Sequence, residues 1–172
     1  MKVAYWSTSC LEPSIEAVSR EVFQLAAAFP GSWIFGVDRH YVARFSWRRR
    51  CAGLHANMYP FLRAVIPVLE LRFDVSHVYG NMTPWFFHKA LRARPIVHTV
   101  TQDSPEPVTE FLERCAAVVV QTETTRERVL ALGIDAAKVH LRRPGIDLSH
   151  FAAVSRKSTL GASPRLLFCS AP

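Results

Sequence analysis

Short apolar runs alternate along this chain with longer stretches in which apolar positions recur about every 3.6 residues. The runs predict buried strands over residues 2–7, 33–37, 53–56, 75–79, 95–100, 116–121 and 138–141. The longer stretches predict helices over residues 15–29, 58–72, 83–91 and 122–133, with a shorter helix inside 104–114. Strands that alternate with helices are typical of parallel β-α-β units. The chain is therefore predicted to be an α/β protein, with a doubly wound, Rossmann-like parallel sheet of six or seven strands and helices on both faces.

The helix boundaries rest on particular residue types. Pro30-Gly31 ends the first helix, and Pro67 predicts a bend in the second because proline lacks an N–H and clashes with the preceding turn. Either Thr122 or Thr124 begins the last helix, and Thr124 with Glu127 also matches the capping-box pattern. These signals leave the predicted strands separated by complete helices.

In doubly wound sheets, ligands bind outside the carboxyl ends of the strands. This rule selects four loops here without any motif: residues 8–14, 80–83, 101–105 and the segment that starts at Thr122. These loops are the predicted ligand edge of the sheet.

The 172-residue chain has a formal net charge of +7, and much of that charge is concentrated near residue 45. Five arginines fall between residues 39 and 50, among them Arg48, Arg49 and Arg50, and aromatic residues are interleaved with them. Such a cluster fits a solvated basic loop, an anionic membrane surface or a phosphorylated substrate. Nucleic acid is not expected as a partner because no recognisable reading motif accompanies the cluster.

Several other classes of protein are excluded by the sequence. No apolar run approaches the roughly 20 residues that span a bilayer, and we identify no secretory signal. The four cysteines form no Cys-x-x-Cys pair, so reduced thiols in a cytoplasmic protein are expected. The loop after the first strand contains no glycine, and no Walker-type Gly-Lys-Ser/Thr is present, which argues against nicotinamide, flavin and nucleoside-triphosphatase sites.

Four segments together resemble the N-terminal domain of family-4-type glycosyltransferases with the GT-B fold. They are Pro13–Glu16 at the first helix, Asp74–Gly80, Pro95–Asp103, and residues 116–151, which end in Pro-Gly-Ile-Asp-Leu-Ser-His-Phe. The last segment is the most specific, since order and spacing agree with the family over more than thirty residues. The resemblance covers essentially the whole chain.

The chain departs from the family at two of these segments. Pro13 and Ser14 replace two glycines, so any backbone contact with a ligand there must differ, although Ser14 can still cap the helix. Thr101 stands where the family has a histidine, and Gln102 stands where it has an aspartate, with Asp103 one residue later. Threonine and glutamine can hydrogen-bond a sugar, but neither titrates near neutral pH as histidine does.

The resemblance implies catalytic roles for Thr101 and Asp103. It implies substrate contacts for Ser14, Glu16 and Gln102. Tyr79, Gly80 and Asn81 are added as predicted substrate contacts because they end a strand on the predicted ligand edge. Structural interpretations remain open for several residues: Glu16 could complement the helix dipole, and Asp103 could form a turn. His77 and His98 lie within strands, where buried structural histidines are more common than catalytic ones.

By this resemblance, residues 1–151 form the acceptor-side domain, 152–164 a linker, and 165–172 the first strand of a missing donor-binding domain. The implied activity is retaining transfer of a sugar from a nucleotide-sugar to a hydroxyl of a lipid, saccharide or metabolite, with no cofactor and no metal. The chain alone is then expected to be inactive. The expected location is the cytoplasm, and a peripheral position at the inner face of the membrane is a further hypothesis. The alternative is a non-catalytic Rossmann-like module that binds a sugar or a phosphate.

Overall fold

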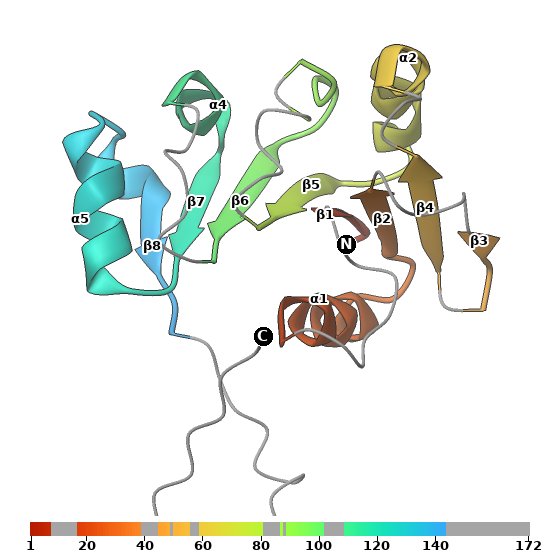
Figure 1. Ribbon diagram of the computed structural model, residues 1–172, viewed down its shortest axis with the longest axis horizontal. Helices are drawn as coiled ribbons and strands as arrows, with labels where there is room; N and C mark the ends of the chain where they lie inside the picture. Colours follow the sequence, from red (N-terminus) through yellow and green to blue (C-terminus); the bar gives the residue numbers. More distant parts are fainter. Residues whose placement is uncertain are drawn as a thin grey trace, which may run out of the picture.

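A single sheet organises the computed structural model, which describes residues 1–7, 17–38, 45–48, 50–55, 59–80, 87, 89–101 and 109–143. Its strands are β1 (Val3–Ser7), β2 (Trp33–Asp38), β3 (Phe45–Ser46), β4 (Cys51–His55), β5 (Val75–Tyr79), β6 (Ile96–Val100), β7 (Ala117–Val120) and β8 (Val139–Leu141). Within the described ranges their order is β3-β4-β2-β1-β5-β6-β7-β8 (Figure 1). Every neighbouring pair is parallel except β3 and β4, which are antiparallel.

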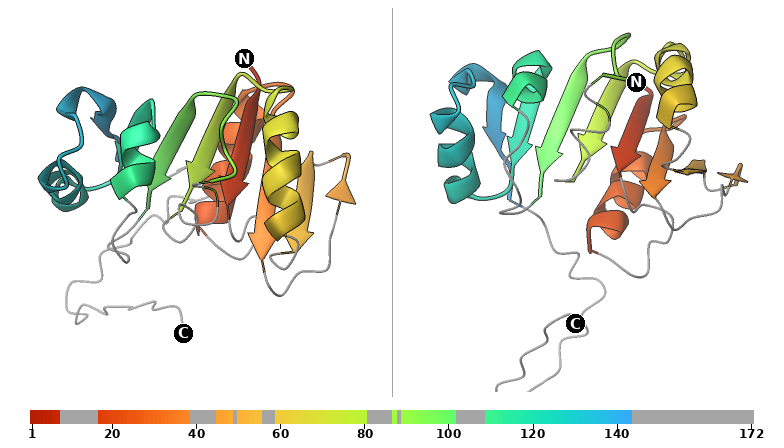
Figure 2. Two further views of the ribbon diagram at one scale, coloured as in Figure 1. Left: turned by 90° about the horizontal axis from the view of Figure 1, so that it is seen from above. Right: turned by 45° about the horizontal axis from the view of Figure 1, so that its top comes forward.

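Helices cover both faces of this sheet. They are α1 (Ala17–Ala28), α2 (Tyr59–Glu70), α4 (Thr109–Arg114) and α5 (Glu123–Ala131), followed by a 3-10 turn at Ala136–Lys138. Figures 1 and 2 show α1 on one face of the sheet and α2 and α4 on the opposite face. The predicted α/β architecture, a Rossmann-like parallel sheet with helices on both faces, is therefore confirmed.

Two apolar cores lie on the two sides of the sheet. The larger core packs residues of α2, α4 and α5 against the sheet, and in it the Trp6 and Phe35 rings stack with their centroids 4.5 Å apart. The smaller core lies under α1 and contains Val22, Tyr5 and Tyr79. Burial on both faces explains why the central strands read as continuous apolar runs in the sequence.

A buried carboxylate links α2 to the strands of the larger core. Glu70, at the end of α2, accepts a hydrogen bond from Ser76 Oγ at 2.7 Å through one oxygen. Its other oxygen accepts from the backbone N–H groups of Arg92 at 2.7 Å and Ala93 at 2.9 Å. Trp6 Nε1 in turn donates to Ser76 Oγ at 3.3 Å. One side chain thereby ties together α2, β5, β1 and the segment that leads into β6.

Some details of the sequence predictions were wrong. The strand expected over residues 53–56 is β4 over Cys51–His55, and the two-residue strand β3 was not expected. The predicted helix over 58–72 is α2, which continues through Pro67 to Glu70, and the bend expected at Pro67 stays a prediction. Of the helix predicted over 83–91 only the end is described, where the N–H groups of Ala90 and Leu91 donate to the Phe87 carbonyl. The predicted linker at 152–164 and the strand at 165–172 lie outside the described residues.

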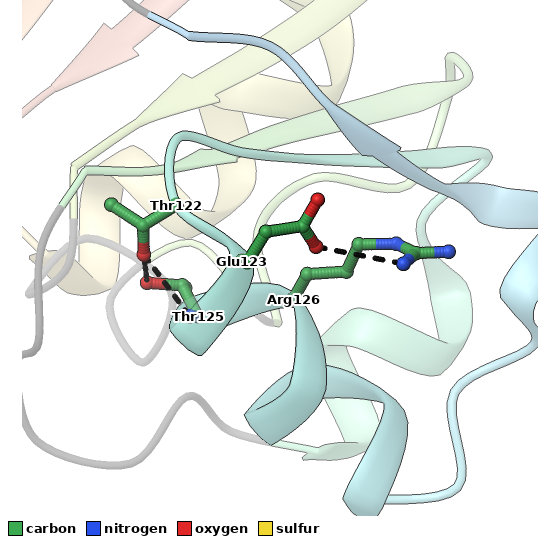
Figure 3. A network of polar contacts seen from close by, with 4 residues as sticks. All are labelled: Thr122, Glu123, Thr125 and Arg126. Carbon is green, nitrogen blue, oxygen red and sulfur yellow. Dashed lines mark hydrogen bonds and ion pairs between the residues drawn. The ribbon is translucent and has the colours of Figure 1, made fainter.

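The structure also identifies which threonine begins α5. Thr122 has extended backbone angles and its side chain accepts a hydrogen bond from the Thr125 N–H at 3.1 Å (Figure 3). Thr122 is therefore the N-cap, and Thr124 lies inside the helix. An ion pair between Arg126 and Glu123 at 3.6 Å follows within the first turns.

In the part of the chain that the structure describes, no helix is both long and apolar enough to span a bilayer.

Candidate functional site at the carboxyl edge of the sheet

The order of the strands brings the carboxyl ends of seven parallel strands to one edge. After β1 the chain adds the parallel strands β2 and β4 on one side of β1. It then adds β5, β6, β7 and β8 on the other side. The reversal of direction lies between β1 and β5, which is where ligands bind in open parallel sheets. Tyr79 and Gly80 at the end of β5 adjoin this point, as the sequence predicted.

Gly80 has a conformation that only glycine adopts readily. Its φ is +106°, and its N–H donates to the Thr99 carbonyl of the neighbouring strand at 3.1 Å. The backbone therefore departs from strand geometry at Gly80 while this residue stays hydrogen-bonded to β6. Thr101, the predicted catalytic residue after β6, leaves the sheet at the same edge and is partly buried.

A hydrogen-bonded group next to this turn was not predicted from the sequence. Gln121, which follows β7, donates from Nε2 to the Tyr79 hydroxyl and to the Glu21 carboxylate of α1, at 3.4 Å in each case. Tyr79 is fully buried, whereas Gln121 and Glu21 are partly exposed. We call Glu21, Tyr79 and Gln121 the edge triad. The buried Tyr79 hydroxyl helps to position the Gln121 amide, and the partly exposed Gln121 amide and Glu21 carboxylate can donate to and accept from the hydroxyl groups of a sugar.

His77 belongs to a row of polar and aromatic side chains on the α1 side of the sheet. Its Nε2 lies 2.7 Å from Thr99 Oγ1, and its ring contacts those of Tyr5 and Tyr79 at 5.3 and 5.7 Å between centroids. Burial, with smaller contributions from repulsion by His98 and Arg142, lowers the pKa of His77 from 6.5 to about 3. Burial raises the pKa of Tyr5 to about 12, although the positive charge of Arg142 acts to lower it. Both groups are therefore neutral at pH 7.

His98 is buried on the opposite side of the sheet, with 1% of its surface exposed. Its Nδ1 lies 3.2 Å from the Val78 carbonyl, so Nδ1 carries the proton and donates it. Among the residues that the structure describes, Nε2 has no hydrogen-bond partner. The Phe111 ring packs edge-on against it at 5.6 Å between centroids. Burial lowers the pKa of His98 to about 4, although the hydrogen bond to Val78 opposes this shift. The surroundings of both histidines agree with the structural interpretation of each.

Two of the predicted anion-contact arginines, Arg48 and Arg50, lie at the opposite edge of the sheet from this site. Arg48 and Arg50 are exposed on the turn between β3 and β4, where the Arg50 N–H donates to the Trp47 carbonyl at 3.2 Å. That turn precedes β4, so it lies at the amino edge of the parallel sheet, opposite Tyr79 and Gly80. The structure does not bring Arg48 and Arg50 together with the predicted substrate residues.

The remaining site predictions fall outside the described residues. They are Ser14, Glu16, Arg49, Asn81, Gln102 and Asp103. Among the residues that the structure does describe, no group of three or more His, Cys, Asp or Glu side chains is placed to hold a metal ion.

Comparisons with known proteins extend these observations. A family model described as Glycosyltransferase Family 4 matches residues 18–150. No curated protein gives a match. Among solved structures, HepE from Anabaena in complex with UDP is similar, with a TM-score of 0.58, 12% identity, and 87% of this chain and 45% of that chain covered. The UDP-GlcNAc 2-epimerase from Methanocaldococcus jannaschii has a TM-score of 0.56 at 13% identity, with 82% of this chain and 45% of that chain covered. The chain thus spans less than half the length of these two proteins, and at such low identity the likeness concerns the fold.

Proposed function

The chain belongs to glycosyltransferase family 4, and from that premise we propose that it is the acceptor-side half of a two-domain GT-B enzyme. The proposed reaction moves a sugar from a nucleotide-sugar to a hydroxyl of a lipid, a saccharide or a small metabolite, with retention at the sugar carbon. The family match over residues 18–150 carries this proposal. The HepE structure with UDP supports a nucleotide-sugar as the donor class.

The proposed acceptor site is the carboxyl edge between β1 and β6. Tyr79 and Gly80 would contact substrate there together with Ser14, Glu16, Asn81 and Gln102, and Thr101 and Asp103 would act at the reacting atoms. The edge triad supports this assignment because Tyr79, Gln121 and Glu21 hold hydrogen-bonding groups at that edge. The donor would be bound mainly by a second domain, for which residues 152–164 are the proposed linker and 165–172 the proposed first strand.

The family resemblance further implies a reaction without a metal or a cofactor. Backbone amides and basic side chains would then stabilise the charge that develops on the leaving diphosphate. We also propose a cytoplasmic location at the inner face of the membrane, with Arg48, Arg49 and Arg50 as contacts to anionic lipid. The exposure of Arg48 and Arg50 supports that contact, and the buried Cys115 thiol suits a reducing compartment.

Nucleotide-sugar binding tests the proposed site. Titration of the chain with UDP-glucose, followed by NMR of the backbone amides, should shift Gly80, Thr101 and Gln121 with weak affinity. Gln121→Leu should weaken this response, whereas Gln24→Leu should leave it unchanged because Gln24 is exposed on α1. Shifts confined to other parts of the chain would contradict the assignment. Release of UDP by the chain alone would contradict the proposed need for a second domain.

One observation favours the alternative of a non-catalytic sugar- or phosphate-binding module. His77 and His98 are neutral at pH 7 because their pKa values are lowered to about 3 and about 4, and Thr101 replaces the family's histidine, so these positions offer no group that titrates near pH 7. A module of this kind would bind UDP-glucose at the same edge. It would also fail to transfer sugar when the chain is joined to the donor-binding domain of a related enzyme.

A further inference from the structure

The helix α2 is apolar on two opposite sides. Leu62 and Ile66 point into the larger core and are buried. Phe61, Val68 and Leu71, the last just beyond the helix end, are exposed to 59%, 65% and 60%. At about 100° per residue, these three and the exposed Ala64 follow one line on the side away from the sheet. We call these four residues the α2 stripe. A surface helix normally carries polar residues on that side, so the stripe indicates a partner.

The charges around the stripe are positive. Arg63 and Arg72 are exposed on its two flanks. Arg94 lies at its end, since Nη2 donates to the Leu71 carbonyl at 3.0 Å. The only acid in α2 is Glu70, which is buried and accepts the hydrogen bonds described above. Nearby, the exposed Asp74 accepts the Lys2 N–H at 2.7 Å. The exposed face of α2 is therefore both apolar and basic.

A second exposed aromatic residue lies on the same side of the sheet. Trp47, at the β3–β4 turn, is 72% exposed, and one edge of its ring contacts Trp33 at 5.0 Å between centroids. Trp33 packs against the larger core, which α2 also covers. Arg48 follows Trp47 directly, Arg50 lies two residues further along the turn, and both are exposed. Figure 1 shows α2 and β3 at the same end of the sheet. The turn therefore extends the surface that the apolar α2 stripe and its flanking arginines form.

We propose that the α2 stripe, with the adjoining β3–β4 turn, is a docking surface for an anionic lipid bilayer. Apolar side chains between arginines suit the boundary of lipid headgroups and acyl chains, where arginine can reach phosphate while its stem stays against apolar groups. A second copy of the chain is a poor occupant because pairing two stripes would bring Arg63, Arg72 and Arg94 of both copies together. This inference goes beyond the proposed reaction and identifies α2, a surface that the sequence analysis did not select.

Sedimentation with lipid vesicles tests the proposal without donor or acceptor. The chain should bind vesicles that contain phosphatidylglycerol, should bind phosphatidylcholine vesicles much less, and should be released by salt. The combined change Arg63→Gln and Arg72→Gln should weaken binding about fivefold per arginine. Phe61→Asp should weaken vesicle binding about tenfold or more, because it replaces an apolar contact with a negative charge that the anionic lipid repels.

A matched pair of arginines provides the control. Arg126→Gln with Arg128→Gln removes the same charge from α5, which lies at the other end of the sheet (Figure 1). This control should bind vesicles like the unchanged chain, and all variants should give the same circular dichroism spectrum and thermal midpoint. Equal loss in the control would show that net charge alone attracts the chain, and it would overturn the proposal. Loss only with Arg48→Gln and Arg50→Gln would assign the contact to the turn and would equally overturn it. A dimer in solution that Phe61→Asp makes monomeric would identify a second copy as the occupant instead.

Discussion

Replacement of Glu70 should destabilise the fold far more than replacement of a carboxylate on its surface. Glu70 is completely buried, and its carboxylate oxygens accept hydrogen bonds from neutral donors. The Arg94 guanidinium donates instead to the Glu70 backbone carbonyl, at 3.3 Å. Ser76, Arg92 and Ala93 supply those donors from two separate segments of the chain. The carboxylate therefore holds α2, β5 and the entry to β6 in one arrangement.

The size of the effect follows from counting these donors. In Glu70→Ala, the Ser76 hydroxyl and the N–H groups of Arg92 and Ala93 lose their acceptor. A buried donor left without a partner costs about 1–3 kcal/mol, and water can reach the two partly buried N–H groups, so the total is about 3–5 kcal/mol. Glu70→Gln keeps the shape and one acceptor oxygen, and it should cost about 1–2 kcal/mol.

Urea unfolding followed by tryptophan fluorescence measures these differences. Matched controls are Glu113→Ala and Glu113→Gln, because Glu113 is exposed on α4. In the contacts between described residues its backbone carbonyl, not its carboxylate, accepts a hydrogen bond, from Lys138 Nζ. The expected order of stability loss is Glu70→Ala, then Glu70→Gln, then both Glu113 variants near zero. If Glu70→Ala loses no more than Glu113→Ala, the carboxylate does not organise this junction and the reasoning fails.

Three further predictions use the same unfolding measurement. The pKa of His98 falls from 6.5 to about 4 on folding, so between these pH values the unfolded chain binds more protons than the folded chain. The free energy of unfolding should therefore decline by about 3 kcal/mol, from this residue alone, as the pH falls from 6.5 to 4. His98→Gln should remove that part of the decline. Thr122→Ala should cost about 1 kcal/mol because it removes the α5 cap, and Thr124→Ala should cost clearly less; equal losses would contradict the assignment of the cap. Gly133→Ala should cost about 1–2 kcal/mol through backbone strain alone, since φ is +85° and, chain neighbours aside, no atom of the described residues lies within 4 Å of the added Cβ. An unchanged midpoint would argue against that conformation.

Much of the fold could be predicted because the central strands β1, β5 and β6 are buried or partly buried on both faces. Such strands appear as unbroken apolar runs, so β1, β5 and β6 were found within a residue or two of their ends. The strand β3 was missed because two residues carry no periodicity and its pairing depends on the antiparallel contact with β4. The cap of α5 needed the structure as well, since Thr122 and Thr124 both satisfy local capping rules.

The residues of the candidate site were likewise predicted only in part. Tyr79 and Gly80 could be selected because they end a predicted strand at the ligand edge. Gln121 and Glu21 were missed because their contact joins residues one hundred positions apart, and only the packing of α1 against the sheet brings them together. The end of a strand at Gln121 was a signal for its position, but no local pattern identified Glu21 as its partner. Which helix residue faces a strand end depends on the angle at which the helix crosses the sheet.

The electrostatics of the carboxyl edge limit the chemistry that its described residues can perform. Tyr5 and His77, which form a row with Tyr79, stay neutral through the whole physiological range because burial moves their pKa values to about 12 and about 3. Thr101 has no titrating group. The described part of this edge is therefore suited to binding and orienting a hydroxyl-bearing acceptor, through the edge triad, rather than to removing its proton by a histidine. For the proposed transfer, the acceptor proton would then pass to Asp103 or to the oxygen of the departing diphosphate, and the substrates themselves would supply part of the acid–base chemistry.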